Sequence, residues 1–341
     1  MKFAVLQFFS WPGKRVPLPT VYDRAFQRIE VMEQTGYDAV WLAEHHFSTY
    51  SVCPSIHIMG AHIAARTERL RIGTGVSLAP FYHPLRLAEE VALLDVLSDG
   101  RVNWGAGRGF DPTEFRAFDV DFAESHPRLR EGVEVVLKAW GEERLTHHGN
   151  FHHFEDVEVL PKPVQTPHPP VWLASTSPDS VRWSARHGYS ILMDPHGTHE
   201  DIRKKRALYQ DELERAGHSM EGRTIPMARN IALAETEEQA REIARRGARF
   251  MFGSYLPPGV GSVDKGVAPQ KTVPPGSIQP SAASDPVESY VDDVVIWGTP
   301  EKVVDDLHRL AEDLPLDYLL CTPLSHRSFE LFTEKVLPRF L

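Results

Sequence analysis

Short apolar runs alternate along the chain with longer segments in which apolar residues recur every three or four positions. A run of four to eight apolar residues is typical of a buried strand, and the longer spacing is typical of an amphipathic helix. The segment "KFAVLQF" (2–8) shows the first pattern, and Val21, Ala25 and Ile29 show the second. The predicted strands cover residues 2–8, 38–43, 70–78, 101–107, 169–175, 189–193, 225–234 and 316–322.

Signals for helix starts and ends lie between these strands. Thr20 is predicted to cap the first helix, and residues 98–100 (Ser-Asp-Gly) are predicted to end the helix that starts near Pro84. Pro178 and the pair Thr299-Pro300 mark the starts of two more helices, because proline suits the first helical turn. The other predicted helices cover about residues 54–66, 129–140, 199–216, 236–252 and 326–338.

Strands that alternate with helices indicate parallel βα units. Eight such units favour an α/β fold of the (β/α)₈ TIM-barrel type over an open doubly wound sheet. No linker is visible near the middle of the chain, so we expect a single domain over residues 1–341. The main break in composition is a stretch rich in proline and glycine, from which we expect a mobile lid or insertion over residues 253–290. A lid over the active end and an insertion without function both fit this stretch.

Composition narrows the class of protein. The chain has 341 residues, and its hydrophobic share of 42% and charged share of 25% are ordinary for a globular protein. Cys53 and Cys321 lie far apart, which argues against a disulfide framework and fits a cytoplasmic protein. No apolar stretch approaches the length of a membrane span. The net charge is −10 and the basic runs 203–206 and 244–249 lie beside acidic residues, so we expect no binding to nucleic acid or to membranes.

Polar residues cluster directly after several predicted strands. The triplet 44–46 (Glu-His-His) follows the second strand, Gly107-Arg108-Gly109 follows the fourth, and the triplet 175–177 (Ser-Thr-Ser) follows the fifth. His83 lies in the loop after the third strand. Because catalytic groups of such barrels lie at the carboxyl ends of the strands, we expect these residues to surround one site.

A metal site could use Glu44, His45, His46 and His83 as ligands. Adjacent histidines on an extended chain point to opposite sides, so both seldom reach one metal ion. The H-E-x-x-H motif and cysteine pairs are absent. We therefore expect no catalytic metal. The histidines in "HHGNFHHF" (147–154) are predicted to form a β-hairpin and not a ligand set.

The segment "GAGRGF" (105–110) partly matches a dinucleotide-binding fingerprint, but Asp111-Pro112 follows it in place of an apolar helix start. A better interpretation is close approach of the backbone to a flat ring, with Arg108 near a phosphate. Residues 175–177 precede the helix that begins with Pro178, and free N–H groups at a helix start bind phosphate. Ser177 could also serve simply as the N-cap of that helix.

Three segments together resemble the bacterial luciferase-like flavin monooxygenases. These are "DAVWLAEHHF" (38–47), "RTERLRIGTGVSLAPFYHPLRLAEEVALLDVLSDGRVNWGAGRGFDPTEF" (66–115) and "PKPVQTPHPPVWLASTSPDS" (161–180). The resemblance implies a (β/α)₈ barrel that uses reduced FMN and O₂ to insert one oxygen atom into a small organic substrate, an aldehyde, ketone or related compound, through a flavin C4a-hydroperoxide. It also implies a separate NAD(P)H-dependent flavin reductase and a homodimer.

The resemblance also implies roles for single residues. His45 and Glu44 would be catalytic, since a histidine can relay a proton near neutral pH. A cis peptide bond between Gly75 and Val76 would lie beneath the flavin ring, and Gly107 stands where bacterial luciferase has a cysteine, so light emission is not implied. The residues expected to bind the cofactor are Gly75, Val76, His83, Gly107, Arg108, Ser175, Thr176 and Ser177.

Two alternatives use the same barrel. A deazaflavin-dependent oxidoreductase would transfer hydride, although "EHHF" and the block after it are closer to the FMN branch. A non-catalytic flavin-binding partner subunit could dispense with the active histidine, which this chain has.

Overall fold

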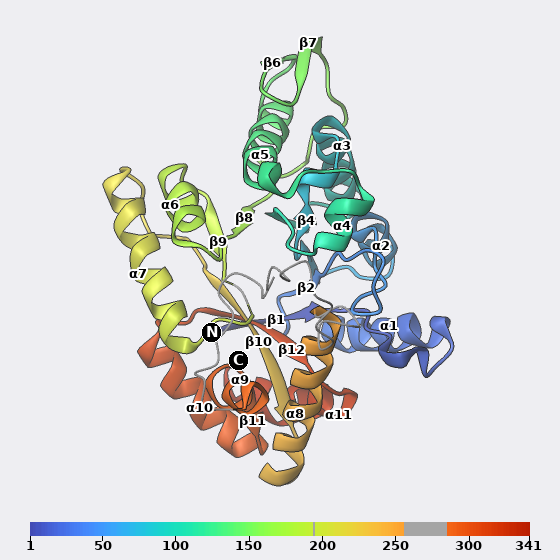
Figure 1. Cartoon of the computed structure of the whole chain (residues 1–341), viewed down its shortest axis with the longest axis vertical. Helices are drawn as coiled ribbons and strands as arrows, with labels where there is room; N and C mark the ends of the chain where they lie inside the picture. The colour runs from blue at the N-terminus through green and yellow to red at the C-terminus, as the bar shows by residue number, and fades with distance from the viewer. Residues whose placement is uncertain (194, 256–284) are drawn as a thin grey trace, which may run out of the picture.

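The computed structural model describes residues 1–193, 195–255 and 285–341, and parallel strands lie at its centre (Figure 1). Each neighbouring pair in this central sheet is parallel. In order around the sheet, the strands within the described residues are β1 (Lys2–Gln7), β2 (Ala39–Leu42), β3 (Arg71–Thr74), β5 (Val102–Gly107), β8 (Val171–Ala174), β9 (Ser190–Leu192), β10 (Pro226–Leu233) and β12 (Tyr318–Pro323).

The sheet closes on itself directly after β9. Met193 forms a bridge with Met227 of β10, and its N–H donates to the Pro226 carbonyl at 3.2 Å. On its other side β10 pairs with β12, which in turn pairs with β1. This ring confirms the predicted (β/α)₈ barrel, and all eight predicted strands are present. Two short strands, β4 (Ser77–Leu78) and β11 (Ile296–Gly298), add to β5 and β10.

The interior of the barrel is filled by alternate residues of its strands. Leu6 of β1 belongs to an inner cluster with Trp41 and Trp172, whereas Val5 packs in the outer cluster under the helices. The two indole rings meet edge to face, with their centroids 5.3 Å apart. A Cβ atom at Gly73 would overlap the Trp41 ring, so the neighbouring strand needs glycine there. Successive side chains of a strand thus point alternately into the barrel and outward to the helices.

The helices surround the sheet in Figure 1, and most start where the sequence predicts. The prediction that Thr20 caps the first helix is wrong. The helix begins at Leu18 without a side-chain cap, because Pro19 fits its first turn. The helices α4 and α9 were not predicted. The described helices are α1 (Leu18–Gln34), α2 (Ile56–Ala64), α3 (Pro84–Leu97), α4 (Pro112–Ala117), α5 (Ser125–Gly141), α6 (Pro178–Arg186), α7 (His199–Arg215), α8 (Glu237–Tyr255), α9 (Pro286–Asp293), α10 (Pro300–Asp313) and α11 (His326–Leu331).

Two predicted irregular segments have different outcomes. The hairpin is confirmed as β6 (Leu145–His148) and β7 (His153–Val157), which extend beyond α5 at the top of Figure 1. The predicted lid over 253–290 is helical at both ends, since residues 253–255 belong to α8 and residues 286–290 to α9. The rest of that prediction, residues 256–284, lies outside the described residues.

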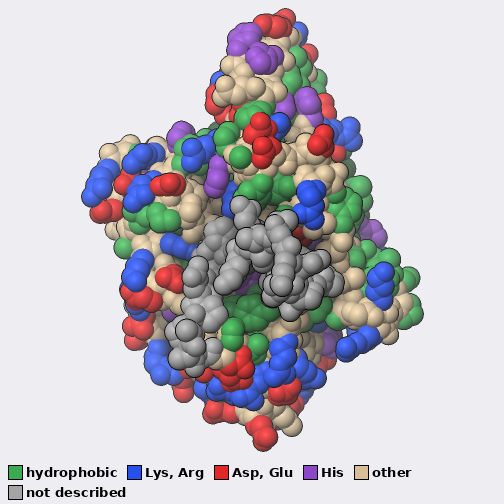
Figure 2. Space-filling view, viewed as in Figure 1, with side chains coloured by type: hydrophobic (Ala, Val, Ile, Leu, Met, Phe, Trp, Pro, Cys, Tyr) green, Lys and Arg blue, Asp and Glu red, His purple; other side chains and the backbone are tan. Residues whose placement is uncertain are grey.

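The surface carries both signs of charge. On the face shown in Figure 2, acidic and basic side chains are interspersed, and neither sign forms a continuous area. In the described part of the chain, no helix combines the length and the apolar character that crossing a membrane requires.

Candidate active site

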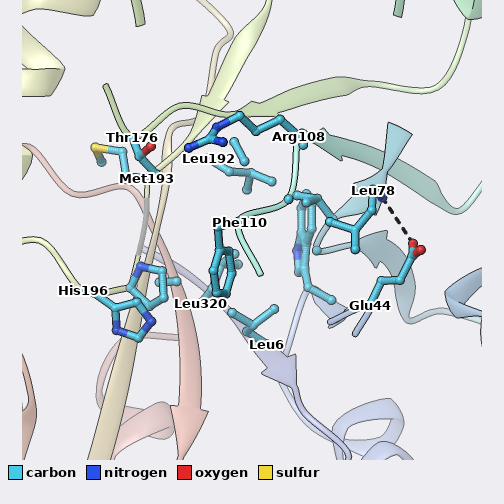
Figure 3. Close-up of a pocket in the computed structure, with 18 of the residues that line it drawn as sticks. Leu6, Glu44, Leu78, Arg108, Phe110, Thr176, Leu192, Met193, His196 and Leu320 are labelled. Atoms are coloured by element: carbon cyan, nitrogen blue, oxygen red, sulfur yellow. Dashed lines mark hydrogen bonds between the residues drawn. The ribbon is translucent and has the colours of Figure 1, made fainter. Parts of the chain in front are cut away.

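A cavity lies at the carboxyl ends of the barrel strands, with about 1130 Å³ of empty space that is partly open to solvent (Figure 3). Its lining includes residues that lie one to three positions after the ends of the five strands β1, β2, β5, β8 and β9. These are Phe8, Glu44 with His45, Arg108, Thr176 and Met193. The floor is apolar and consists of Leu6, Trp41, Leu192, Ala228 and Leu320.

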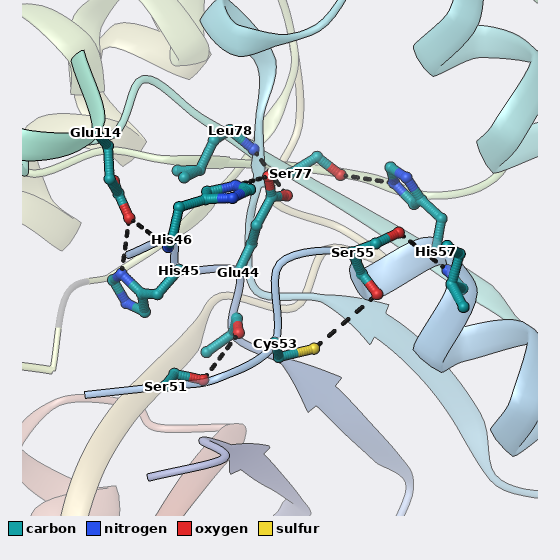
Figure 4. A network of polar contacts seen from close by, with 12 residues as sticks. Glu44, His45, His46, Ser51, Cys53, Ser55, His57, Ser77, Leu78 and Glu114 are labelled. Atoms are coloured by element: carbon teal, nitrogen blue, oxygen red, sulfur yellow. Dashed lines mark hydrogen bonds and ion pairs between the residues drawn. The ribbon is translucent and has the colours of Figure 1, made fainter. Parts of the chain in front are cut away.

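The Glu44 carboxylate is held in place from two sides. One oxygen, Oε1, lies 3.0 Å from Nε2 of His46, and the other accepts a 3.3 Å hydrogen bond from the backbone N–H of Leu78 (Figure 4). The side chain of Glu44 is only 2% exposed. The imidazole that Glu44 contacts is thus His46, which does not line the cavity, and not the catalytic candidate His45.

His45 has a carboxylate partner of its own, Glu114. Nδ1 of His45 lies 3.4 Å from Oε1 of Glu114, which also accepts a 2.9 Å hydrogen bond from the His46 backbone N–H (Figure 4). Glu114 is 1% exposed and belongs to α4. The rings of Phe8 and Phe110 pack against the His45 imidazole, with centroids 6.0 and 5.9 Å away. An apolar wall and a buried carboxylate therefore surround this imidazole, whose side chain is 12% exposed.

Sequence reasoning missed Glu114, although a signal was present. Asp111-Pro112 was used only to reject a dinucleotide fingerprint, yet it is a helix start. The Asp111 side chain accepts from the Thr113 N–H and caps α4. A helix that starts directly after β5 must place its first turn at the carboxyl end of the barrel, and Glu114 lies in that turn.

The opposite end of the cavity carries a cation. Figure 3 shows the Arg108 guanidinium directed toward Thr176. The guanidinium lies over the Phe122 ring at 4.9 Å and donates to Oγ of Ser125 at 3.4 Å. Within the described residues it has no carboxylate partner. Ser180, in the first turn of α6, lines the cavity as well.

Of the three residues 175–177, one lines the cavity and two have structural contacts. Thr176 lines the cavity, whereas Ser175 is fully buried and its hydroxyl lies 3.0 Å from that of Ser184. Ser177 caps α6 in a reciprocal pair with Ser180. Ser177 therefore serves as the N-cap of α6, which was one of its two predicted roles. Ser180 lines the cavity, whereas Ser175 and Ser177, which were expected there, do not.

Gly75 and Gly107 both belong to the wall of the cavity. The Gly75–Val76 bond is cis, as the resemblance implied. Gly75, Val76 and Gly107 all line the cavity. A Cβ atom at Gly107 would lie 2.5 Å from Cγ2 of Val76, so glycine there leaves room for Val76 rather than for a larger ligand.

The structure does not bring His83 to this cavity, contrary to expectation. Its ring packs against His152 and Phe154 of the hairpin region, with both centroid distances at 5.5 Å. The chain after β3 turns through β4 and a short 3₁₀ helix (Ala79–Phe81) before it reaches His83. Those additional residues carry the side chain away from the ends of the strands.

Two further histidines line the cavity that sequence reasoning did not select. His126 lies in the first turn of α5, and His196 follows β9. Nδ1 of His196 lies 2.8 Å from the Tyr290 hydroxyl, which accepts a 2.9 Å hydrogen bond from Asn230. Within the described ranges, no group of three His, Cys, Asp or Glu side chains is arranged to hold a metal ion.

The sequence pattern of one family, described as luciferase-like monooxygenase, matches residues 1–317. This chain belongs to the luciferase-like monooxygenase family. It is therefore an oxidoreductase of a monooxygenase family.

Relatives within the family differ in substrate. The oxygenase component of flavin-dependent trigonelline monooxygenase from Acinetobacter baylyi is 30% identical over 261 residues, which is 75% of this chain and 72% of that one. Limonene 1,2-monooxygenase from Rhodococcus erythropolis is 27% identical over 92% of this chain and 80% of its own. The crystal structure of monooxygenase RslO1 from Streptomyces bottropensis is 28% identical, has a TM-score of 0.83 and is covered in full, as is this chain.

The fold is also shared with proteins that use other cofactors. A coenzyme F420-dependent tetrahydromethanopterin reductase from Methanopyrus kandleri has a TM-score of 0.77 at 19% identity, with 100% of this chain and 99% of that one covered. At that identity the likeness concerns the fold alone. Flavin dependence is supported by the relative that is named as flavin-dependent, and the choice of flavin depends on the residues of the cavity.

The cavity residues fit a flavin phosphate. A flat ring needs apolar surface on its faces, which the floor and the Gly75–Val76 segment supply. A phosphate needs cations and hydrogen-bond donors, which Arg108 and Thr176 supply at one end. The separation of an apolar region from a cationic end matches a ligand with an apolar ring and an anionic tail.

Proposed function

We propose that this protein is the oxygenase of a two-component system that uses reduced FMN and O₂ to insert one oxygen atom into an aldehyde, a ketone or a related small molecule. One observation carries the proposal. The cavity is mainly apolar, and the arginine at one end has no carboxylate partner among the described residues. On the cavity wall, a partly buried imidazole is paired with a buried carboxylate. The route through a flavin C4a-hydroperoxide, which the resemblance implies, is part of the proposal.

The residues that would hold FMN follow from the lining. Arg108 and Thr176 would bind the phosphate, while Val76 and Gly107 would face the ring. Reduced FMN, when bound, would supply the two electrons with which O₂ gives one atom to the substrate and one to water. The apolar floor would exclude solvent water, which otherwise diverts such reactions to hydrogen peroxide.

His45 would hold or move the proton that accompanies oxygen transfer. Its Nδ1 faces Glu114, so Nε2 is the nitrogen left for the cavity. A carboxylate beside one imidazole nitrogen fixes the orientation of the ring. Glu114 is then a positioning residue, whereas Glu44 acts on the neighbouring imidazole of His46.

The partners belong to the proposal as well. A relative is named as an oxygenase component, which supports a separate NAD(P)H-dependent flavin reductase for this chain. We further propose a homodimer, as the resemblance implies, and a cytoplasmic location, which the two distant cysteines favour.

A rapid-mixing experiment tests the proposed function. Protein with anaerobically reduced FMN is mixed with oxygenated buffer and a panel of aldehydes and ketones, and product and hydrogen peroxide are both quantified. We expect oxygenated product from the wild type and mainly hydrogen peroxide from His45→Gln, with FMN affinity unchanged. His83→Gln serves as the matched control, because His83 lies outside the cavity. Equal yields of product from His45→Gln and the wild type would contradict the role given to His45.

A further inference from the structure

We propose that His126 is a second phosphate-binding residue at the Arg108 end of the cavity, and that it takes up a proton when the phosphate of the cofactor binds. The inference rests on the proposed function, because it requires a ligand with a phosphate at this end. It assigns to His126 a role that the sequence did not suggest, and it makes cofactor binding dependent on pH.

The placement of His126 supports this role. It lines the cavity together with Arg108, Thr176 and Ser180. Its neighbour Ser125 accepts a hydrogen bond from Arg108, which brings the guanidinium to the first turn of α5. The His126 ring makes no hydrogen bond or ion pair with any described residue, so a polar group of a ligand could use it.

The charged groups around His126 come from three elements. Arg108 follows β5, Arg130 lies one turn further along α5, and Asp179 lies in the first turn of α6. Asp179 is directed to Arg182, with Nη1 and Oδ1 3.1 Å apart, and is largely exposed. The surroundings of the imidazole are therefore positive on balance before any ligand arrives.

This balance determines the protonation state of the free protein. Burial lowers the pKa of His126 below its usual 6.5, and the charges of Arg108 and Arg130 lower it further. A phosphate that carries nearly two negative charges at neutral pH reverses the local field. An opposite charge in contact favours the protonated imidazole, so the pKa of His126 should be higher in the complex than in the free protein.

The sign of the linkage follows from these two states. Protonated His126 adds to phosphate affinity, and this contribution is present below the pKa of the complex and is lost as the pH rises through it. Between the two pKa values, FMN affinity should weaken by up to about tenfold for each pH unit. Riboflavin, which lacks the phosphate, should show no such dependence.

Calorimetry with oxidised FMN tests the inference without turnover. Titrations at pH 6.5 to 8.5, each in two buffers with different ionisation enthalpies, give the number of protons taken up per FMN. Because the second pKa of a phosphate monoester is about 6, the ligand itself releases few protons at pH 7.5. We expect uptake that approaches one proton with the wild type and none with riboflavin.

Three variants complete the experiment. His126→Gln should lose the proton uptake and bind FMN about tenfold to a hundredfold more weakly, as expected for a lost charge-assisted hydrogen bond. His126→Arg should bind FMN without proton uptake, because its charge is permanent. His148→Gln, at an exposed position of the hairpin, should retain the wild-type uptake.

The outcomes separate this inference from the proposed function. If FMN binds more tightly than riboflavin but the wild type takes up no proton, or His126→Gln takes up as many as the wild type, the inference is overturned while the FMN site stands. If neither flavin binds, the proposed cofactor fails and the inference fails with it. The comparison of FMN with riboflavin in the wild type does not depend on any variant folding.

Discussion

The two ends of the cavity differ in how they balance charge. At the His45 end, each imidazole has a buried carboxylate partner within the protein, Glu114 for His45 and Glu44 for His46. At the Arg108 end, the guanidinium packs on an aromatic ring and has no carboxylate among the described residues. The first end is electrostatically complete without a ligand, and the second is completed by an anion. Proton transfer therefore suits the first end and anchoring of a phosphate suits the second.

The largest expected effect comes from removing the cation. Arg108→Gln should weaken FMN binding by about tenfold to a hundredfold, because a charge-assisted hydrogen bond contributes about 1.5–3 kcal/mol. Riboflavin affinity should stay unchanged. Fluorescence titration with both flavins measures the two constants. An equal loss for FMN and riboflavin would show that Arg108 supports the ring and not the phosphate.

A substitution at the His45 end should change the yield of oxygenated product and leave the affinity for FMN unchanged. Glu114→Gln keeps an oxygen that can accept from the His46 N–H but removes the negative charge beside His45. We expect about tenfold less product per O₂ consumed, the usual scale for a proton-transfer group being about 100-fold or more. FMN affinity should remain as in the wild type. Product and hydrogen peroxide assays test this, and a loss of FMN binding would contradict the division between the two ends.

Glu114→Ala tests how much the Glu114 side chain contributes to stability. The half-buried N–H of His46 would lose its acceptor, which should lower the free energy of unfolding by about 1–3 kcal/mol relative to Glu114→Gln. Urea unfolding of both variants measures the difference. Equal stability of the two variants would mean that another group accepts from this N–H.

A methyl group at the cavity wall should lower the stability of the fold moderately. Gly107→Ala places a Cβ atom 2.5 Å from Val76 and 3.3 Å from Cβ of Ala174, and such overpacking costs about 1–3 kcal/mol. Gly141→Ala, at the end of α5, meets no atom within 4 Å and is the matched control. Thermal unfolding should show a loss only for Gly107→Ala. A similar melting temperature for both variants would contradict the contact with Val76.

The smallest effect is expected at His83. Its ring packs on His152 and Phe154, away from the cavity. His83→Ala should therefore change FMN affinity by less than about twofold, the range of surface substitutions away from a site. Titration beside Arg108→Gln makes the comparison. A loss as large as that of Arg108→Gln would mean that His83 reaches the ligand after all.

The candidate site was predictable where residues follow strands directly, and less so elsewhere. Glu44, His45, Arg108 and Thr176 line the cavity because each lies within three residues of the end of a barrel strand. Ser175 is equally close but faces Ser184, since adjacent residues at a strand end point in opposite directions. The position of a residue along the chain therefore predicts at which end of the barrel it lies. The direction of its side chain decides whether it lines the cavity.

The sequence alone determined the eight strands, most helix starts and the closed barrel, because periodicity and capping act within a few residues. Only the tertiary structure decided which polar groups meet. His45 and Glu114 are 69 positions apart, and their contact requires α4 to fold back from β5 over the end of β2. Ser125 reaches Arg108 in the same way, through the first turn of α5. Electrostatic partners are set by distances in space, which strand order and helix placement determine and local sequence does not encode.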